Sequence, residues 1–290
     1  MKLSAYIAFL LVSISIACTG YAVYGDEVWY GMNFDYPPES DIRFSVSDLD
    51  GCSIFVMHFF NNDRLFWVPT VGMNEHGVFS SLQYQCPMIE GTPEPEPDQL
   101  YIYQLFNTAI NDCSAVNELE CLLDSLELIN LYDLTLHALI ADPSGNALIA
   151  EAGDGENLIT GISGDWIVMT NFSNADFIHT PPEEIVGVGD ERYRRALSYI
   201  EENYDSFGLP QAIGTLETAV NNHAEWGTKA SMVFDPLEGI VYIGIDGDFQ
   251  RLWRVSMGQG IIETWSGFVK YRSALVGGRG ITVPELRTWE

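Results

Sequence analysis

Hydrophobic and polar residues alternate over several short stretches in the first part of the chain, with many β-branched and aromatic side chains among them. A period of two is typical of β-strands that bury one face. The pattern predicts strands at 27–35, 41–48, 53–60, 64–69 and 79–85, and the glycines that bound 72–78 indicate a turn.

Helical periodicity follows this block of strands. Residues 99–110 have the spacing of an amphipathic helix, and Ser114 can cap a second helix. The apolar face of that second helix is formed by Val116, Leu119, Leu122, Leu123 and Leu126.

Strands and helices alternate again in the second half. The predicted strands are 134–142, 146–151, 165–171, 228–235, 240–246 and 251–257, and the predicted helices are 191–203 and 211–222. The pattern after Met257 is mixed and assigns no element. Strand blocks interleaved with paired helices predict an α+β fold in which two sheets pack together with helices outside.

The beginning of the chain has the pattern of a secretory signal peptide at 1–17, with one positive charge at Lys2 followed by an apolar run. This run is shorter than the roughly 18 apolar residues that a membrane-spanning helix needs. Ser15 and Ala17 supply the small side chains that a signal peptidase reads. Cleavage after Ala17 would leave Cys18 as the first residue of an extracytoplasmic protein, either secreted or periplasmic.

Two interpretations of Cys18 follow from this position. It could be the acylated cysteine of a lipoprotein, although Ser15 is a poor match to the branched apolar residue usual three places before such a cysteine. It could instead be catalytic. A free α-amine has a pKa near ~7.7 and can take the thiol proton, so an N-terminal cysteine supplies both nucleophile and base.

The remaining 18–290 segment predicts one domain. The chain of 290 residues is 47% hydrophobic, which suffices for a large core. Its strongest break in composition, EGTPEPEPD at 90–98, is short enough to be a surface loop.

The net charge of −28 disfavours phosphate backbones and anionic membrane surfaces as partners. We therefore expect no nucleic acid, and no membrane association once the leader is removed. An anionic substrate would need a local basic patch, which Arg192, Arg194 and Arg195 could provide.

Five cysteines are present in a chain predicted to be exported. If Cys18 stays free, Cys52, Cys86, Cys113 and Cys121 could form two disulfides, of which Cys113–Cys121 is one candidate among three pairings; five reduced thiols are the alternative. No paired-cysteine spacing is present and the histidines are scattered, so the motifs predict no metal site.

Five ordered stretches carry a family resemblance: CTG with GMNFD, GMNEHGVFSSLQY, LTLHALIADPSGNALIAE, MTN, and ERYRRAL followed by TKASMVFD. Together they resemble the choloylglycine hydrolase and penicillin V acylase family of N-terminal nucleophile hydrolases, to which acyl-CoA:6-aminopenicillanic acid acyltransferases are related. The resemblance implies a four-layer αββα sandwich, hydrolysis of a linear non-peptide amide, and no cofactor. It also implies an oligomer of identical subunits, since relatives often form tetramers.

The resemblance also implies five catalytic residues. Cys18 would be the nucleophile, Asp35 would orient its α-amine, and Arg192 would lower the thiol pKa. The backbone N–H of Tyr84 and the side chain of Asn171 would bind the oxyanion. Each residue alone has an ordinary structural explanation, such as a turn cap for Asp35.

One position departs from the family pattern. Met32 stands where the family usually has an arginine. Either Arg192 is sufficient, or Arg43 or Arg64 substitutes from elsewhere, or the enzyme is slow.

The expected function is a cysteine amidohydrolase acting through a thioester on a small N-acyl amide. Penicillin V, conjugated bile salts, N-acyl homoserine lactones and N-acyl amino acids all fit this chemistry. Strand aromatics could line an apolar acyl pocket or pack in the core; they are Phe55, Phe59, Phe60, Phe66 and Trp67. The alternatives are an acyltransferase, a lipid-anchored binding protein on the same fold, and a structural secreted domain.

Overall fold

Two antiparallel eight-stranded sheets form the centre of the molecule. The structure is a computed structural model, which describes residues 18–37, 40–49, 51–62, 65–88, 91, 94–131 and 134–289. The predicted signal peptide at 1–17 lies outside the described residues. Sheet A has the order β12 (Trp166–Met169), β1 (Cys18–Tyr24), β2 (Val28–Asp35), β13 (Thr228–Asp235), β14 (Ile240–Ile245), β15 (Asp248–Ser256), β16 (Ile261–Ser266) and β17 (Ser273–Leu275). Sheet B has the order β11 (Asn157–Gly161), β10 (Ala147–Ala152), β9 (Leu136–Ala141), β6 (Phe79–Tyr84), β5 (Phe66–Asn74), β4 (Cys52–Asn61), β3 (Ile42–Leu49) and β18 (Ile281–Thr282).

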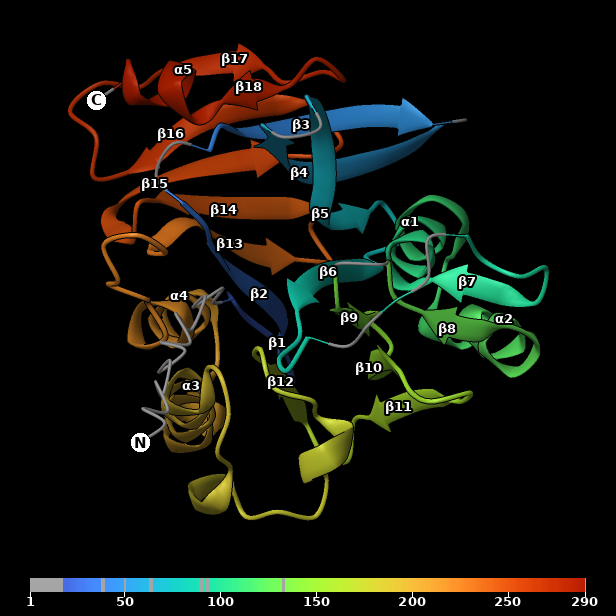
Figure 1. Cartoon of the computed structure of the whole chain (residues 1–290). Coiled ribbons are helices and arrows are strands. Elements are labelled where there is room, and N and C mark those ends of the chain that lie inside the picture. The colour runs from blue at the N-terminus through green and yellow to red at the C-terminus, as the bar shows by residue number, and fades with distance from the viewer. Residues whose placement is uncertain are drawn as a thin grey trace, which may run out of the picture.

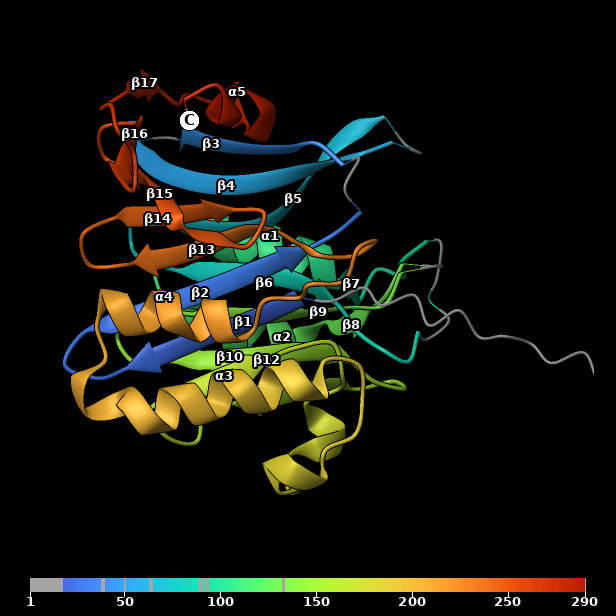
Figure 2. The same ribbon diagram turned by 90° about the vertical axis from the view of Figure 1, so that its left-hand side faces the viewer.

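Helices cover the outer face of each sheet. Figure 1 shows α3 (Asp190–Asn203) and α4 (Leu209–Thr218) beside sheet A, and α1 (Ile102–Asp112) with α2 (Glu120–Ser125) on the other side, beside sheet B. The turned view shows α3 and α4 lying over sheet A and running roughly along its strands β1 and β2 (Figure 2). The predicted α+β fold and its αββα layers are confirmed.

The apolar periodicity of the strands decides which face meets which layer. On β2, Tyr30, Met32 and Phe34 point into the core between the sheets, while Trp29 packs against the α3–α4 layer. Because both faces are covered, almost the whole strand is buried. Each fully buried large apolar side chain contributes roughly 1.5–3 kcal/mol relative to an exposed one.

A glycine sets the spacing between β1 and β2. Gly31 lies opposite Tyr21, and a Cβ atom on Gly31 would lie 2.2 Å from a ring carbon of Tyr21. Tyr21 is fully buried and its hydroxyl donates to the carbonyl of Ala212 on α4 at 2.7 Å. The glycine of the GMNFD stretch therefore makes room for a tyrosine that ties sheet A to its helices.

Several predicted elements change at their ends. The strand predicted at 64–69 continues to Asn74 as β5, so the turn is shorter than 72–78. Residues 99–101 form β7 (Gln99–Tyr101), paired in parallel with β8 (Glu127–Ile129), before α1 begins. Ala115, and not Ser114, precedes the 3₁₀ turn Val116–Leu119 that leads into α2.

The chain end completes both sheets, although its sequence pattern predicted no element. After β16 and β17 extend sheet A, β18 pairs with β3 at the far edge of sheet B. The chain then enters α5 (Val283–Arg287), which begins with a Thr282–Glu285 capping box. Among the helices of the described residues, none is long and apolar enough to cross a membrane.

Candidate active site

Cys18 is the first residue of β1 and is almost fully buried, at 2% exposure. It pairs with Phe34 of β2, and its side chain belongs to the core between the sheets. Because alternate residues of a strand point to opposite faces, its neighbour Thr19 points toward the α3–α4 layer.

The backbone nitrogen of Cys18 donates a hydrogen bond to Oδ1 of Asn171 at 2.8 Å. Asn171 is the second residue after β12, whose antiparallel pairing with β1 carries it to the beginning of that strand. Its Nδ2 donates to the carbonyl of Tyr84 at the end of β6 at 2.7 Å. Asn171 therefore links the Cys18 backbone in sheet A to sheet B.

Arg192 covers this arrangement from the first turn of α3 and is 6% exposed. Its guanidinium donates to the carbonyl of Cys18, to Oγ1 of Thr19 at 2.9 Å and to Oδ1 of Asn171 at 2.8 Å. Gly189, in a left-handed conformation at φ 87°, gives the guanidinium room, because a Cβ there would lie 2.6 Å from Nη2. Burial lowers the pKa of Arg192, while Asp35 and Cys18 act to raise it.

Asp35 is fully buried at the end of β2. Its Oδ1 accepts from Oγ1 of Thr228 at 2.6 Å, and its Oδ2 lies 3.9 Å from Nη1 of Arg192. That Oδ2 has no hydrogen-bond partner among the described residues. Burial raises the pKa of Asp35 from 3.8 to about 7, and Arg192 and Thr228 limit the rise.

The thiol of Cys18 is protonated at neutral pH in the uncleaved chain. Burial, and then the charge of Asp35, raise its pKa from 9.0 to about 12, while a hydrogen bond from the Asp35 backbone and the charge of Arg192 oppose the rise. The structure therefore brings Cys18, Asp35, Asn171 and Arg192 together, with the Tyr84 carbonyl bound to Asn171.

Gln83 is a buried site residue that sequence reasoning missed. Alternation along β6 directs Gln83, and not the Tyr84 side chain, toward the face between the sheets. Its Nε2 approaches Sδ of Met32 at 3.4 Å, and its Oε1 has no hydrogen-bond partner among the described residues. The space that it occupies exists because residue 20 is glycine: a Cβ there would lie 2.7 Å from Nε2 of Gln83.

Met32 supplies no cation to this site, and Arg43, the one of the two considered substitutes that the structure describes, lies elsewhere. Arg43 stacks over the ring of Trp67 on β5, 4.5 Å from its centroid. Arg64 lies outside the described residues. Arg192 is the cationic side chain that the described contacts place beside Cys18.

Glu151 holds the loop that carries Asn171. This fully buried carboxylate on β10 accepts backbone N–H bonds from Asn174 at 3.0 Å and Ala175 at 2.8 Å. It also accepts from Oγ of Ser173 and contacts Nδ1 of His137, both at 3.2 Å. An acid at an apolar position of the predicted strand 146–151 is the signal that could have revealed it.

The arginines 192, 194 and 195 do not form the single basic patch that their sequence spacing suggested. Arg192 turns inward to Cys18, whereas Arg194 pairs with Asp190 at 3.5 Å and lines a surface hollow of about 500 Å³ together with Arg195. A second hollow, of about 670 Å³, lies at the other end of β1, around Tyr24 and Asp26. Cys18 lines neither hollow.

An aromatic cluster begins beside Cys18. Phe34 stacks on Tyr36 and Phe59, with ring centroids 5.3 and 5.7 Å apart, and Tyr36 contacts Trp226 at 6.0 Å. Of the strand aromatics considered for an acyl pocket, Phe59 belongs to this cluster, while Phe55 packs in the core against Phe234. Phe60 and Trp67 contact each other.

All five cysteines are free thiols, including Cys113 and Cys121, whose pairing was one expectation. The structure therefore corresponds to the alternative of five reduced thiols.

Structures with the same fold are known, although no protein-family model and no curated protein sequence matches the chain. Two mutant forms of the conjugated bile acid hydrolase from Clostridium perfringens match with a TM-score of 0.62, at 15% and 16% identity. The matches cover 89% and 86% of this chain and 96% and 97% of theirs. Penicillin V acylase from Agrobacterium tumefaciens matches with a TM-score of 0.58 at 16% identity, over 86% of this chain and 91% of its own. The resemblance predicted from the motifs is thereby confirmed at the level of the fold.

Proposed function

We propose that the chain is the precursor of an N-terminal cysteine amidohydrolase of the choloylglycine hydrolase and penicillin V acylase type. It would be exported, cleaved after Ala17, and then hydrolyse a linear non-peptide amide through a thioester on Cys18. The similar structures are named as a bile acid hydrolase and a penicillin acylase, which supports this class of reaction.

The observation that carries the proposal is that side chains form hydrogen bonds with the backbone nitrogen and carbonyl of Cys18. Its nitrogen is held by Asn171 and its carbonyl by Arg192, two buried side chains from segments 153 and 174 residues away in the sequence. An ordinary strand nitrogen is satisfied by a neighbouring strand, whereas this nitrogen meets a side chain. Such a contact suits a nitrogen that becomes a terminal amine.

Cleavage would convert an inert thiol into a reactive one. In the uncleaved chain the pKa of Cys18 is about 12, so almost no thiolate forms near neutral pH. A new α-ammonium group beside the sulfur would favour the thiolate, because a nearby positive charge lowers a thiol pKa. Oδ2 of Asp35, which has no hydrogen-bond partner among the described residues, is a ready acceptor for that group.

The reaction would then proceed in two halves. The α-amine takes the thiol proton, the sulfur attacks the acyl carbon, and the α-ammonium returns the proton to the leaving amine. The tetrahedral oxyanion would be bound by the Tyr84 backbone N–H and by the second N–H of Asn171, since one N–H of its amide already donates to Tyr84. Water deprotonated by the α-amine then hydrolyses the thioester and releases the acid.

The substrate would be a small N-acyl amide with an apolar acyl group. The aromatic cluster of Phe34, Tyr36, Phe59 and Trp226 adjoins Cys18 and offers apolar surface for that group. Penicillin V, conjugated bile salts, N-acyl amino acids and N-acyl homoserine lactones are the compounds to test.

The first experiment determines the mature N-terminus by sequencing and intact mass, and measures thiol alkylation. We expect a chain beginning at Cys18 whose thiol reacts much faster than that of the uncleaved chain. On a panel of N-acyl amides, Cys18→Ser should lower the rate on the order of 10³-fold or more. Asn171→Ala should lower it about 10²- to 10³-fold. Cys121→Ser, which changes an exposed cysteine, is the matched control and should keep full activity.

Three results would contradict the proposal. A lipid-modified Cys18 would leave no free thiol and would indicate a lipid-anchored binding protein. A Cys18→Ser variant with unchanged activity would exclude the nucleophile, and an active protein that retains residues 1–17 would exclude activation by cleavage. If a competing amine captures the acyl group in preference to water, the enzyme is an acyltransferase.

A further inference from the structure

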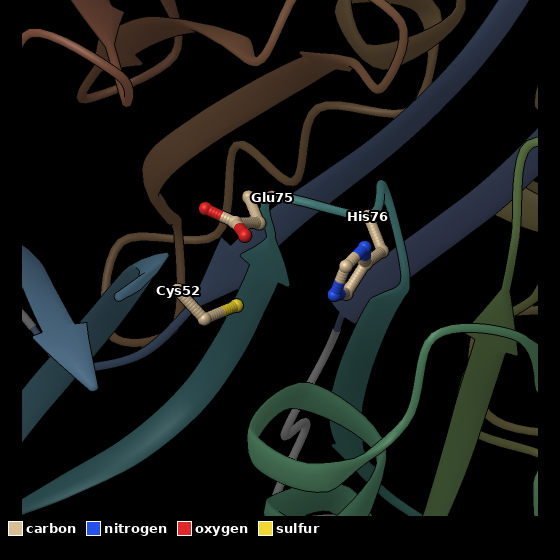
Figure 3. A group of neighbouring side chains, drawn as sticks. All are labelled: Cys52, Glu75 and His76. Atoms are coloured by element: carbon tan, nitrogen blue, oxygen red, sulfur yellow. The ribbon is translucent and has the colours of Figure 1, made fainter. Parts of the chain in front are cut away.

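A second group of reactive side chains lies on sheet B, away from the elements that carry Cys18, Asn171 and Arg192. The thiol of Cys52, the carboxylate of Glu75 and the imidazole of His76 each place one potential metal ligand within 4.8 Å of the other two. Figure 3 shows the sulfur and a ring nitrogen facing one another below the carboxylate. The sequence motifs predicted no metal site because Cys52 is far from the other two along the chain.

The register of the sheet brings these residues together. Cys52 begins β4, and Glu75 and His76 follow directly after the end of β5. Ile54 pairs with Asn74 in the antiparallel ladder of the two strands, so continuing that register places Cys52 opposite His76. The site is thus built on paired strands and does not depend on a long loop.

The turn that carries Glu75 and His76 is firmly held. Asn74 is buried, and its Oδ1 accepts the backbone N–H of His76 at 3.0 Å and that of Val78 at 3.1 Å. Gly77 turns the chain at φ 77°, and a Cβ there would lie 2.5 Å from Pro143. A ligand pair on such a turn loses little conformational entropy when it binds an ion.

The carboxylate of Glu75 is held toward Cys52 before any ion is bound. Its Oε2 accepts the backbone N–H of Ser53, the residue after Cys52, at 3.1 Å. No ion pair among the described residues engages Glu75, so its charge is available to a cation. The side chains of Glu75 and His76 are exposed and Cys52 is half-buried, so an ion can enter from solvent.

We propose that Cys52, Glu75 and His76 bind a divalent transition-metal ion, and that Zn²⁺ fits their donors best. A thiolate, an imidazole and a carboxylate are the usual ligands of zinc, with water in the fourth position. The nitrogen, oxygen and sulfur ligands of tetrahedral zinc lie about 3.3 to 3.6 Å apart at its normal bond lengths. The three atoms, which lie within 4.8 Å of one another, therefore have to draw closer when the ion binds. Binding releases the thiol proton to solvent, and the thiolate and carboxylate charges balance Zn²⁺.

The test titrates the purified protein with Co²⁺ and follows the sulfur-to-cobalt charge-transfer absorption; Zn²⁺ competition then gives the zinc affinity. The wild type should show the absorption and Cys52→Ser should lose it, whereas Cys121→Ser should keep it. Glu75→Gln and His76→Ala should each weaken zinc binding about 10-fold or more. Zinc should also raise the unfolding temperature of the wild type but not of Cys52→Ser.

Several outcomes would overturn the proposal. Cys52→Ser could keep the charge-transfer absorption, or Cys18→Ser could lose it, which would place the ion at Cys18. Equal zinc affinities of the wild type, Glu75→Gln and His76→Ala would show that the three side chains do not act as one site. These measurements do not use amide hydrolysis, so their result is independent of the proposed enzyme activity.

Discussion

Glu151→Gln should destabilise the fold, although it replaces only one carboxylate oxygen with an NH₂ group. The two carboxylate oxygens of Glu151 receive hydrogen bonds from two backbone N–H groups and one hydroxyl, at 2.8 to 3.2 Å. Glutamine keeps one oxygen and places an NH₂ group at the other position. In either orientation this group faces the N–H of Asn174 or of Ala175, a donor against a donor.

The magnitude follows from those contacts. A buried donor left without an acceptor costs about 1–3 kcal/mol, and a hydrogen bond to a charged group contributes about 1.5–3 kcal/mol. Since Glu151 is fully buried, water cannot replace the lost bonds. We therefore expect the free energy of unfolding to fall by roughly 2–5 kcal/mol.

Equilibrium urea unfolding, followed by fluorescence and circular dichroism, measures this change. Glu156→Gln is the matched control, because Glu156 is an exposed acid close to Glu151 in the chain. It should change the free energy of unfolding by no more than about 0.5 kcal/mol. Equal stability of Glu151→Gln and the wild type would refute the view that this carboxylate holds the 171–175 segment.

Two further predictions concern the strands beneath the candidate site. The pKa of Asp35 is raised from 3.8 to about 7 in the folded uncleaved chain, so the folded state binds the proton of this carboxyl group more tightly than the unfolded state does. The contribution of Asp35 to the free energy of unfolding therefore falls as the pH rises from about 4 to 7. Urea titrations should show this as a gain of Asp35→Asn over the wild type: the difference between their free energies of unfolding should increase by a few kcal/mol from pH 4 to pH 8. A difference that stays constant with pH would contradict the raised pKa. Gly31→Ala should lower the free energy of unfolding, measured by thermal unfolding, by about 1–3 kcal/mol or more, because the new Cβ would overlap the buried ring of Tyr21. Gly161→Ala should be tolerated, because nothing lies within 4 Å of its Cβ position. Similar unfolding temperatures for these two glycine variants would show that β1 and β2 can separate to accept a methyl group.

The sequence alone determined the succession of strands and helices and much of the candidate site. Residues 228–235 were predicted as a strand with the observed ends, because local alternation and flanking turns encode an element directly. The ordered motifs also pointed to Cys18, Asp35, Asn171 and Arg192, which the structure brings together.

Only the tertiary structure decided the contacts between distant segments. The pairing of β6 with β9 sets which side chains of β6 face sheet A, and Gln83, not the side chain of Tyr84, meets Met32 there. The support of the Asn171 loop by Glu151 and the approach of Cys52 to His76 also depend on strand register. Strand register is chosen by packing across whole sheets, because a shift of one residue would turn every side chain to the opposite face, and local sequence carries too little of that information.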